Sequence, residues 1–439
     1  MAGPSRIRTG VPQQPFAAIF SQRCGRLYGV LSQTVTVVGI GADGWAGLPS
    51  RSKAALELAG VLAGGPRQLS LLPDCVAGRR IVLPSPLLPG LSELVAEHAG
   101  SALVVLASGD PMFYGIGSTL VGMLGASRVT VLPHLSSVSL AAARLGWALD
   151  DVTVVSLVGR PRELLHPVLQ PGRRVLALTA ETTAAAGVRA LLEARGFGGS
   201  QVTVLADLGG EQEAVRPADG RPHSRLAIIA IDCRLDGGAA PLPRVPGLPD
   251  DAFEQDGQIT KREIRALALA ALTPVPGQLL WDVGAGSGSI GIEWMRVHPA
   301  SRTIAVEPRA DRRDRITRNA AALGVPGLVV VPGSAPDALS GLPRPDAVFI
   351  GGGVTDDGVV RACWDALAAG GRLVANAVTI EGQEILARWW RGTGGTLTRI
   401  GVERADALGA FTTWRPALPV VQWSVRKQES SPAPSQESA

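Results

Sequence analysis

The sequence predicts an α/β protein with two separate α/β regions. Short β-branched runs alternate with Ala- and Leu-rich stretches along most of the 439 residues, a rhythm typical of helices that cover a largely parallel sheet. A proline- and glycine-rich segment at 236–250 interrupts the rhythm, and a second alternation follows it. The length agrees with this division, because domains usually contain roughly 100–200 residues.

The first region is expected to open with a strand at 34–41, a β-branched run that ends in glycines. The apolar spacing of 52–63 predicts a helix after it. Further expected strands lie at 102–107, 129–132, 152–157, 174–178, 201–205 and 226–231, and further expected helices at 137–145 and 184–194.

Residues 236–250 are expected to form a linker, because four prolines and three glycines in this segment cannot continue a helix or a central strand. In the second region, helices are expected at 261–272, 290–296, 312–323 and 359–367, and strands at 279–283, 303–306, 328–331, 347–350 and 372–375. The Ser-, Pro-, Glu- and Gln-rich end at 427–439 is expected to be disordered.

The composition excludes several classes of protein. Hydrophobic residues make up 46% of the chain and charged residues 18%, which supplies real cores and excludes a disordered chain. No run approaches the roughly 18 apolar residues of a membrane helix. A net charge of +4 is too small for a dedicated nucleic-acid binder, so neither nucleic acid nor membrane is expected as a partner.

The four cysteines, Cys24, Cys75, Cys233 and Cys363, form no CxxC pair and have no histidine at metal-ligand spacing. They are expected to be reduced thiols, and no metal site is expected. The first 34 residues hold arginines but no acid, and they lack the apolar segment of a signal peptide. We therefore expect a loose N-terminal extension at 1–34 and a cytoplasmic protein.

The strongest motif is an apolar strand that ends in alternating glycines, Gly284 to Gly288, before a helix begins. Glycines allow a tight turn and the close approach of a ligand to the backbone. Glu307 follows the next strand, about 20 residues further on, where a carboxylate can accept hydrogen bonds from ribose hydroxyls. The motif therefore predicts a nucleotide-type cofactor.

Three interpretations of this motif are open. Gly286, Gly288 and Gly291 match GxGxxG, which would suit a nicotinamide dinucleotide and an oxidoreductase. S-adenosylmethionine is favoured by Asp282, which can meet its amino-acid end, and by Ala335, in a loop after the third strand where an adenine is usually contacted. The glycines could also form a purely structural turn. For the whole chain, a further alternative is a cofactor-binding scaffold in which one module has lost activity.

Two neighbouring features each allow a structural and a functional interpretation. Thr260 has the position of a helix N-cap, with Glu263 completing a capping box, and it could instead contact the cofactor. Three glycines at 351–353 end the fourth strand, where they could admit a large flat substrate or form a simple loop.

Together, these motifs between 255 and 353 resemble the C-terminal methyltransferase module of the precorrin-6Y C(5,15)-methyltransferase (decarboxylating) family of cobalamin biosynthesis. The resemblance implies a Rossmann-like S-adenosylmethionine-dependent methyltransferase fold over 251–426. It also implies cofactor contacts at Thr260, Gly284, Ala285, Gly286, Ser287, Gly288, Glu307 and Ala335.

The first region carries three segments of its own, GIGADG at 39–44, GDPMFYG at 109–115 and LPHLSSV at 132–138. Each alone could be a turn. Together they resemble the tetrapyrrole methylase superfamily, of the cobalt-precorrin C5-methyltransferase type. This resemblance implies two α/β subdomains over 35–235 that clamp S-adenosylmethionine in a cleft lined by Gly109, Asp110, Pro111 and Ser137.

Two further residues of these segments have implied places. Asp43 would lie at the mouth of the cleft. His134 could act as a general base, but a packing or hydrogen-bonding role is favoured.

The two resemblances imply a bifunctional methyltransferase. The first module would methylate a precorrin at C5, and the second would methylate it at C15 and remove CO2 from the acetate of ring C. One S-adenosylmethionine per module and a homo-oligomer are expected. A sulfonium methyl is already electrophilic, so catalysis should come mainly from proximity, and no residue is assigned as catalytic.

Charged residues of the second module are weaker candidates. Arg265, Arg296 and Arg309 are candidates for carboxylate recognition, because guanidinium groups pair with carboxylates through two hydrogen bonds. Glu293 and Asn376 are candidates for proton transfer, with surface or capping roles as the alternative.

Overall fold

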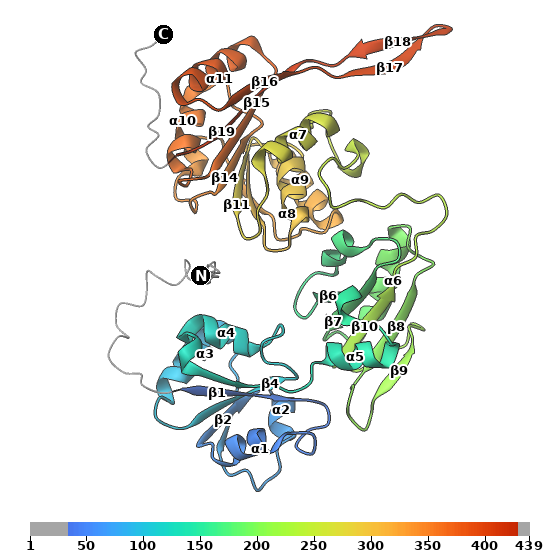
Figure 1. The fold of residues 1–439 in the computed structure, drawn as a ribbon, viewed down its shortest axis with the longest axis vertical. Coiled ribbons are helices and arrows are strands. Elements are labelled where there is room, and N and C mark those ends of the chain that lie inside the picture. Colours follow the sequence, from blue (N-terminus) through green and yellow to red (C-terminus); the bar gives the residue numbers. More distant parts are fainter. Residues whose placement is uncertain (1–33, 429–439) are drawn as a thin grey trace, which may run out of the picture. The chain divides into compact units, whose positions relative to one another are not determined.

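The computed structural model describes residues 34–428. Residues 1–33 of the extension expected at 1–34, and residues 429–439 of the tail expected at 427–439, lie outside them. The chain forms two compact units (Figure 1). Of the described residues, the N-terminal unit contains 34–159, Arg173–Ala190 and Ser200–Asp232. The C-terminal unit contains Arg160–Gly172, Leu191–Gly199 and the described residues from 233 to 428. Both units are mixed α/β, which confirms the predicted fold class.

The first sheet of the N-terminal unit is entirely parallel, with the strand order β3-β2-β4-β1-β5. Its strands are β1 (Val35–Ile40), β2 (Val61–Gly64), β3 (Arg79–Val82), β4 (Leu103–Ser108) and β5 (Val129–Leu132). Its helices are α1 (Ser50–Glu57), α2 (Pro66–Ser70), α3 (Leu87–Glu97) and α4 (Ile116–Leu124).

Successive side chains of these strands point to opposite faces of the sheet, so each face packs against different helices. Val38 packs with Leu56 of α1 on one face, and Val37 packs with Leu91 of α3 on the other. This sheet therefore has a buried core on each side.

The second sheet of this unit has the order β6-β7-β10-β8-β9, and β10 runs antiparallel to both of its neighbours. Its strands are β6 (Val152–Ser156), β7 (Arg174–Thr179), β8 (Gln201–Ala206), β9 (Ala214–Pro217) and β10 (Ala227–Asp232), and its helices are α5 (Ser137–Leu145) and α6 (Ala184–Ala194). The short 3-10 helices in this part of the chain are η2 (Ala126–Arg128), η3 (Leu149–Asp151) and η4 (Arg162–Val168).

The C-terminal unit contains one seven-stranded sheet with the order β13-β12-β11-β14-β15-β19-β16. Its strands are β11 (Leu279–Val283), β12 (Arg302–Glu307), β13 (Val329–Pro332), β14 (Ala347–Ile350), β15 (Arg372–Ala377), β16 (Thr396–Ile400) and β19 (Val420–Arg426). The first five strands in this order are parallel, and β19 runs antiparallel to β15 and β16.

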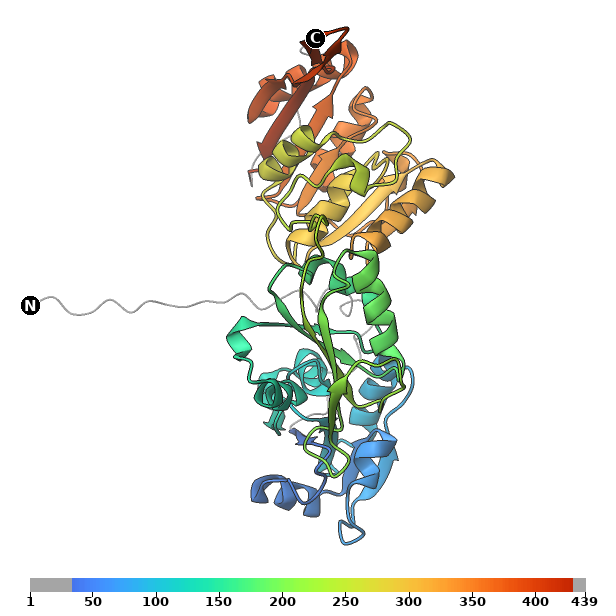
Figure 2. The same cartoon turned by 90° about the vertical axis from the view of Figure 1, so that its right-hand side faces the viewer.

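Helices cover both faces of this sheet (Figures 1 and 2). They are α7 (Arg262–Leu272), α8 (Ser289–Val297), α9 (Ala310–Ala322), α10 (Asp357–Ala366) and α11 (Ile380–Thr393), with the 3-10 turns η5 (Asp250–Ala252) and η6 (Asp337–Leu339). Leu280 and Phe349 pack against α7 and α8, whereas Trp281 and Ile350 pack against α10 and α11.

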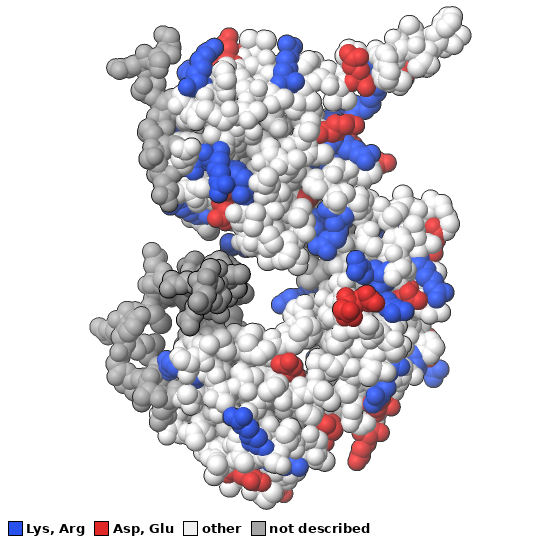
Figure 3. All heavy atoms as spheres, in the orientation of Figure 1, with Lys and Arg blue, Asp and Glu red and all other residues white. Residues whose placement is uncertain are grey.

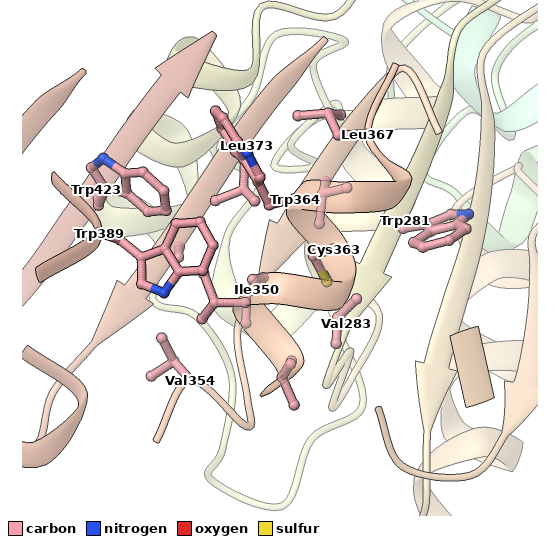
Figure 4. Packing of buried hydrophobic residues seen from close by; sticks show 14 of the residues in the cluster. Trp281, Val283, Ile350, Val354, Cys363, Trp364, Leu367, Leu373, Trp389 and Trp423 are labelled. Atoms are coloured by element: carbon pink, nitrogen blue, oxygen red, sulfur yellow. The ribbon is translucent and has the colours of Figure 1, made fainter. Parts of the chain in front are cut away.

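A cluster of tryptophans fills the core beneath α10 and α11 (Figure 4). The ring centroids of Trp364, Trp389 and Trp423 lie 5.9–6.4 Å apart, and all three side chains are fully buried. Trp389 Nε1 donates to Asp357 Oδ1 at 2.8 Å, so its polar edge is satisfied within the core.

A two-stranded antiparallel ribbon, β17 (Glu403–Leu408) and β18 (Phe411–Pro416), projects from the end of the sheet between β16 and β19 (Figure 1). Most of its residues are exposed. Its far end shows no charged side chain in Figure 3, and Phe411 and Trp414 are 80% and 66% exposed.

Two expectations about secondary structure were wrong. The helix expected at 52–63 ends at Glu57, and Val61–Gly64 form β2, whose four residues are buried between β3 and β4. A short apolar run fits a buried strand as well as a helix, so periodicity alone cannot separate them. The second N-terminal sheet is also mostly antiparallel, although a largely parallel sheet was expected.

No helix among residues 34–428 is long and apolar enough to cross a membrane. The described cysteines, Cys75, Cys233 and Cys363, are free thiols, and Cys24 lies outside the described residues.

Candidate active sites

Each unit contains a cavity that includes predicted cofactor residues. The cavity in the C-terminal unit, here called the C-terminal cavity, has a volume of about 650 Å³. The cavity in the N-terminal unit, the N-terminal cavity, has a volume of about 450 Å³.

The glycine loop after β11 forms one wall of the C-terminal cavity. Gly284, Gly286 and Gly288 all have positive φ angles, between 59° and 76°. A Cβ on Gly284 would lie 2.6 Å from Gly352 Cα, so the two loops pack backbone against backbone. Only glycine fits this arrangement without displacing the loop after β14.

Glu307 holds the glycine loop in place from the end of β12. Its side chain is 2% exposed, its Oε2 accepts from the Gly286 N–H at 2.9 Å, and its Oε1 accepts from the Arg309 N–H at 3.1 Å. The carboxylate lines the cavity and has further lone pairs for ligand hydroxyls.

Asp282 lies deeper, at the end of β11, and is 1% exposed. Its Oδ2 accepts from the Gly291 N–H at 2.9 Å, which ties the strand to the first turn of α8. Burial raises the pKa of the Asp282 carboxyl to about 7, against the hydrogen bond from Gly291, and the charge of Glu307 raises it further. The carboxyl therefore changes its charge near neutral pH.

The structure places Thr260, Gly284, Ala285, Gly286 and Ala335 on the wall of the same cavity. Thr260 does not cap a helix, because α7 begins at Arg262 and its N-cap residue, Lys261, makes no side-chain cap. The capping-box interpretation of Thr260 is therefore wrong. The Thr260 carbonyl instead accepts from Arg265 Nη1 at 2.5 Å, which fixes the backbone beside the cavity.

Two residues of the predicted set do not line the cavity. Ser287 is buried, and its carbonyl accepts from Asn319 Nδ2 at 3.0 Å. A Cβ on Gly288 would lie 2.9 Å from a methyl of Ile316, so this glycine lets α9 pack closely. Their predicted cofactor contacts stay predictions.

The N-terminal cavity contains Gly109, Asp110 and Ser137 in its wall, whereas Pro111 lies outside it. Gly109 has a φ angle of 57°, and a Cβ there would lie 3.1 Å from the Leu135 carbonyl oxygen. Asp110 Oδ1 accepts from the Met112 N–H at 2.8 Å, which shapes the turn. The Pro111 carbonyl accepts from the Gly117 N–H at 2.9 Å and connects the loop to α4.

Comparison with known proteins agrees with this geometry. The family described as "Precorrin methyltransferase domain" matches residues 251–427, and the tetrapyrrole (corrin/porphyrin) methylase family matches residues 34–221. A precorrin-6Y C(5,15)-methyltransferase (decarboxylating) of Sinorhizobium is 49% identical over 404 residues, which cover 91% of this chain and 97% of the relative. The chain belongs to the precorrin-6Y C(5,15)-methyltransferase (decarboxylating) family.

Two further members of this precorrin methyltransferase family are similar to the chain. The protein of that name from Mycobacterium tuberculosis is 45% identical over 403 residues, which cover 90% of this chain and 100% of the relative. The second is the C-terminal domain of the Rhodobacter capsulatus protein, known from a crystal structure, whose sequence is 46% identical to this chain. The match covers 42% of this chain and 100% of that domain, with a TM-score of 0.41. Both resemblances stated from the sequence are confirmed.

Asp43 and His134 form a pair beside the N-terminal cavity rather than in its wall. His134 Nε2 lies 3.0 Å from both carboxylate oxygens of Asp43, and their side chains are 10% and 31% exposed. A Cβ on Gly41 would lie 2.4 Å from Asp43 Oδ1, so this glycine makes room for the pair. The contact is the hydrogen-bonding role favoured for His134.

Arg265 and Glu293 turn inward and form a buried pair. Arg265 Nε donates to Glu293 Oε1 at 2.6 Å, and the side chains are 0% and 2% exposed. Glu293 also accepts from the N–H groups of Gly247 and Leu248 at 2.5 and 3.0 Å. This pair fixes the end of the 236–250 segment against α7 and α8 and makes no contact with the cavity.

The other charged or polar candidates divide between core and cavity. Arg296 is buried and donates to the carbonyls of Leu323 and Pro243, which is a structural role. Arg309 lines the C-terminal cavity and pairs with Asp311 at 3.0 Å. Asn376 also lines it, and its Oδ1 accepts from Gln422 Nε2 at 3.1 Å.

Sequence reasoning missed part of the C-terminal cavity. Lys261, Arg312, Val402, Arg404 and Leu418 line it as well. These residues form no motif and come from α9, the start of α7 and the base of the ribbon, so only the tertiary fold brings them together. No group of three or more His, Cys, Asp or Glu side chains within residues 34–428 could hold a metal ion.

Proposed function

We propose that the chain is a bifunctional S-adenosylmethionine-dependent C-methyltransferase of cobalamin biosynthesis. It methylates a precorrin at C5 and C15 and removes CO2 from the acetate side chain of ring C. The observation that carries this function is the 49% identity to the Sinorhizobium enzyme over 404 residues, a length that neither region alone supplies. We assign C5 methylation to the N-terminal region and C15 methylation with decarboxylation to the C-terminal region.

Each cavity is proposed to hold one S-adenosylmethionine. The C-terminal cavity fits it, because Gly284 and Gly352 let two backbone loops pack closely in its wall and two buried carboxyl groups, Asp282 and Glu307, line that wall. These acceptors suit an ammonium group and ribose hydroxyls. Its proposed contacts are Thr260, Asp282, Gly284, Ala285, Gly286, Glu307 and Ala335, and those of the N-terminal cavity are Gly109, Asp110 and Ser137.

When bound, S-adenosylmethionine supplies an electrophilic methyl group, so the protein needs no nucleophile of its own. The chain contributes position: the glycine loop, held by Glu307 and Asp282, fixes one wall of the cavity, and Phe349 and the glycines after β14 form the next. Holding reactants in near-attack geometry can supply about 7–11 kcal/mol of the barrier.

Decarboxylation breaks the bond between the acetate methylene and its carboxylate and releases CO2. The macrocycle can delocalise the electron pair that remains, and a proton added to the former methylene carbon completes the methyl group. The protein again contributes orientation and exclusion of water. The apolar side chains of Phe349, Val402 and Leu418 in the C-terminal cavity suit that task.

A single incubation tests the proposed function. The purified chain is incubated with the reduced precorrin and S-adenosylmethionine, and the products are examined by mass spectrometry. A gain of two methyl groups with loss of one CO2 is expected. No change in mass, with S-adenosylhomocysteine bound, would reject the substrate, and binding of a nicotinamide dinucleotide instead would favour an oxidoreductase.

We also propose that the chain forms a homo-oligomer. Support comes from the ribbon β17–β18, whose apolar side chains Leu408, Phe411 and Trp414 are 58–80% exposed. Such a surface is typical of association between chains. Analytical ultracentrifugation of the purified chain tests this proposal, and a monomer at micromolar concentration would reject it.

A further inference from the structure

The C-terminal cavity extends beyond the proposed cofactor contacts along the edge of the sheet. Three of the proposed cofactor contacts lie at or just after the ends of neighbouring strands: Asp282 near the end of β11, Glu307 at the end of β12 and Ala335 after β13. These strands form one side of the sheet, in the order β13-β12-β11. The remaining wall, here called the outer half, lies where β14 and β15 end and the antiparallel β19 begins. The strand order reverses between β11 and β14, which is where α/β sheets usually bind ligands.

Most side chains of the outer half are apolar, and Asn376 near the end of β15 is a polar exception. Phe349, Val378, Val402 and Leu418 line this half, and Leu418 and Val378 are 77% and 54% exposed. A flat apolar ligand in this half would cover Leu418 and Val378 and remove their side chains from water, which is favourable. The face of a tetrapyrrole macrocycle has this shape and chemistry.

Arg404 introduces a positive charge at the rim of this apolar half. It lies near the start of β17, where the ribbon is closed by a hydrogen bond of 2.9 Å from the Ala417 N–H to the Val402 carbonyl. Glu263 also lines the cavity and pairs with Arg404, so Arg404 is the basic member of an ion pair at this point of the rim. A carboxylate on the edge of a ligand in this half would meet its guanidinium.

Arg404 makes an ion pair that a ligand can replace. Its Nη2 donates to Glu263 Oε2 at 2.5 Å, and the two side chains are 51% and 44% exposed. Ion pairs this exposed usually contribute only about 0–1 kcal/mol. A guanidinium carries five N–H donors, and its planar fork matches a second carboxylate.

We propose that Arg404 binds a carboxylate of the precorrin in the outer half and thereby positions the macrocycle for the reaction at C15. This inference rests on the proposed function and deepens it. Glu263 holds the guanidinium in place until the substrate carboxylate takes over part of its hydrogen bonds.

The full chain supplies the test, with the rate of CO2 release measured against precorrin concentration. Arg404→Ala is expected to raise KM for CO2 release about 10-fold, as the loss of one charge-assisted hydrogen bond would, and to change kcat less than about two-fold. Arg404→Lys keeps the charge and is expected to restore part of the affinity. The affinity for S-adenosylhomocysteine should not change in either variant.

Arg415 provides a matched control. It lies directly opposite Arg404 in the ribbon, pairs with Asp406 at 2.8 Å and does not line the cavity. Arg415→Ala removes the same charge from the same ribbon and is expected to leave KM unchanged. Equal KM values for Arg404→Ala, Arg415→Ala and the unsubstituted chain would overturn the proposal.

Two other outcomes would also overturn the proposal, for different reasons. A loss of S-adenosylhomocysteine affinity in Arg404→Ala equal to the rise in KM would show that Arg404 only shapes the cavity, which also overturns the proposal. If the unsubstituted chain itself releases no CO2 from the precorrin, the proposed function fails, and the inference fails with it.

Discussion

The carboxyl of Asp282 accepts a hydrogen bond from the backbone N–H of Gly291 at 2.9 Å, within a site where the side chain is 1% exposed. Burial raises the pKa of this carboxyl from 3.8 to about 7. The folded chain therefore keeps a proton between these pH values that the unfolded chain has released. By linkage, the resulting contribution to stability is largest below about pH 4 and is lost as the pH rises toward 7.

Binding of a cationic amino-acid group should follow the opposite trend, because the ionised carboxylate attracts it. We expect affinity for S-adenosylhomocysteine at the C-terminal cavity to rise as the pH increases from 6 to 8. Isothermal titration calorimetry of the unsubstituted chain and Asp282→Asn separates this effect, since the variant should lose the pH dependence and bind about 10-fold more weakly. The same pH profile in both proteins would contradict the assignment.

The backbone contact between Gly284 and Gly352 leads to a second prediction. Gly284→Ala would place a Cβ 2.6 Å from Gly352 Cα at a φ angle of 69°. We expect a loss of at least about 2 kcal/mol in the free energy of unfolding, with loss of binding at the C-terminal cavity. Urea denaturation followed by tryptophan fluorescence measures the first effect, because seven of the nine tryptophans belong to the C-terminal unit.

Gly341 is the control for this substitution. Its φ angle is 75°, and a Cβ there would meet nothing within 4 Å. Gly341→Ala should therefore cost only the left-handed backbone strain, about 1 kcal/mol, and leave binding intact. Equal losses in the two variants would show that the close approach to Gly352 is unimportant.

The buried pair of Arg265 and Glu293 predicts a large asymmetry between single and double substitutions. Arg265→Ala leaves a buried carboxylate without its cation and should cost about 3–5 kcal/mol in the free energy of unfolding. Replacing Arg265 by Met and Glu293 by Gln together should cost less than Arg265→Ala alone. Thermal and urea unfolding of the unsubstituted chain and these two variants tests this, and a loss in the double variant equal to or larger than that of Arg265→Ala would contradict it.

The tryptophan cluster predicts a contrast between two neighbours in α11. Trp389 is fully buried, whereas Trp390 is 40% exposed. Trp389→Ala should lower the free energy of unfolding by about 3–5 kcal/mol through the cavity it leaves, and Trp390→Ala by less than about 1 kcal/mol. Urea denaturation of both variants checks the contrast, and similar losses would argue against the cluster as part of the core.

The strands with glycine loops could be predicted from the sequence, because an apolar run, a turn and a helix all leave local signals. The tight turn at Gly284 and the carboxylate at Glu307 belong to this class. The strand Val61–Gly64 could not be predicted, since its burial depends on pairing with β3 and β4. Local pattern gives no information about such partners.

The outer half of the cavity and the buried ion pair were beyond prediction for a related reason. Arg404 lies 141 positions from Glu263 in the sequence, so no local pattern connects the two residues. Arg265 and Glu293 are of residue types that are usually exposed. Arg265 and Glu293 became core residues because the chain at Gly247 and Leu248 packs over them and supplies N–H donors. These groups meet only in the folded chain, and no local sequence motif predicts that they do.

Asp110 provides the last prediction, which tests whether the two cavities bind independently. Its Oδ1 accepts from the Met112 N–H at 2.8 Å and shapes the loop in the wall of the N-terminal cavity. Calorimetry should show two S-adenosylhomocysteine molecules per unsubstituted chain. In Asp110→Ala, one site should weaken about 10- to 100-fold, because a small displacement of this loop misplaces the ligand. The other site should keep its affinity, since its lining residues all belong to the C-terminal unit.

The exposed Asp150 is the control for Asp110, and Asp150→Ala should retain both sites. Weakening of both sites in Asp110→Ala would contradict independent binding, and an unchanged titration would remove Asp110 from the proposed site.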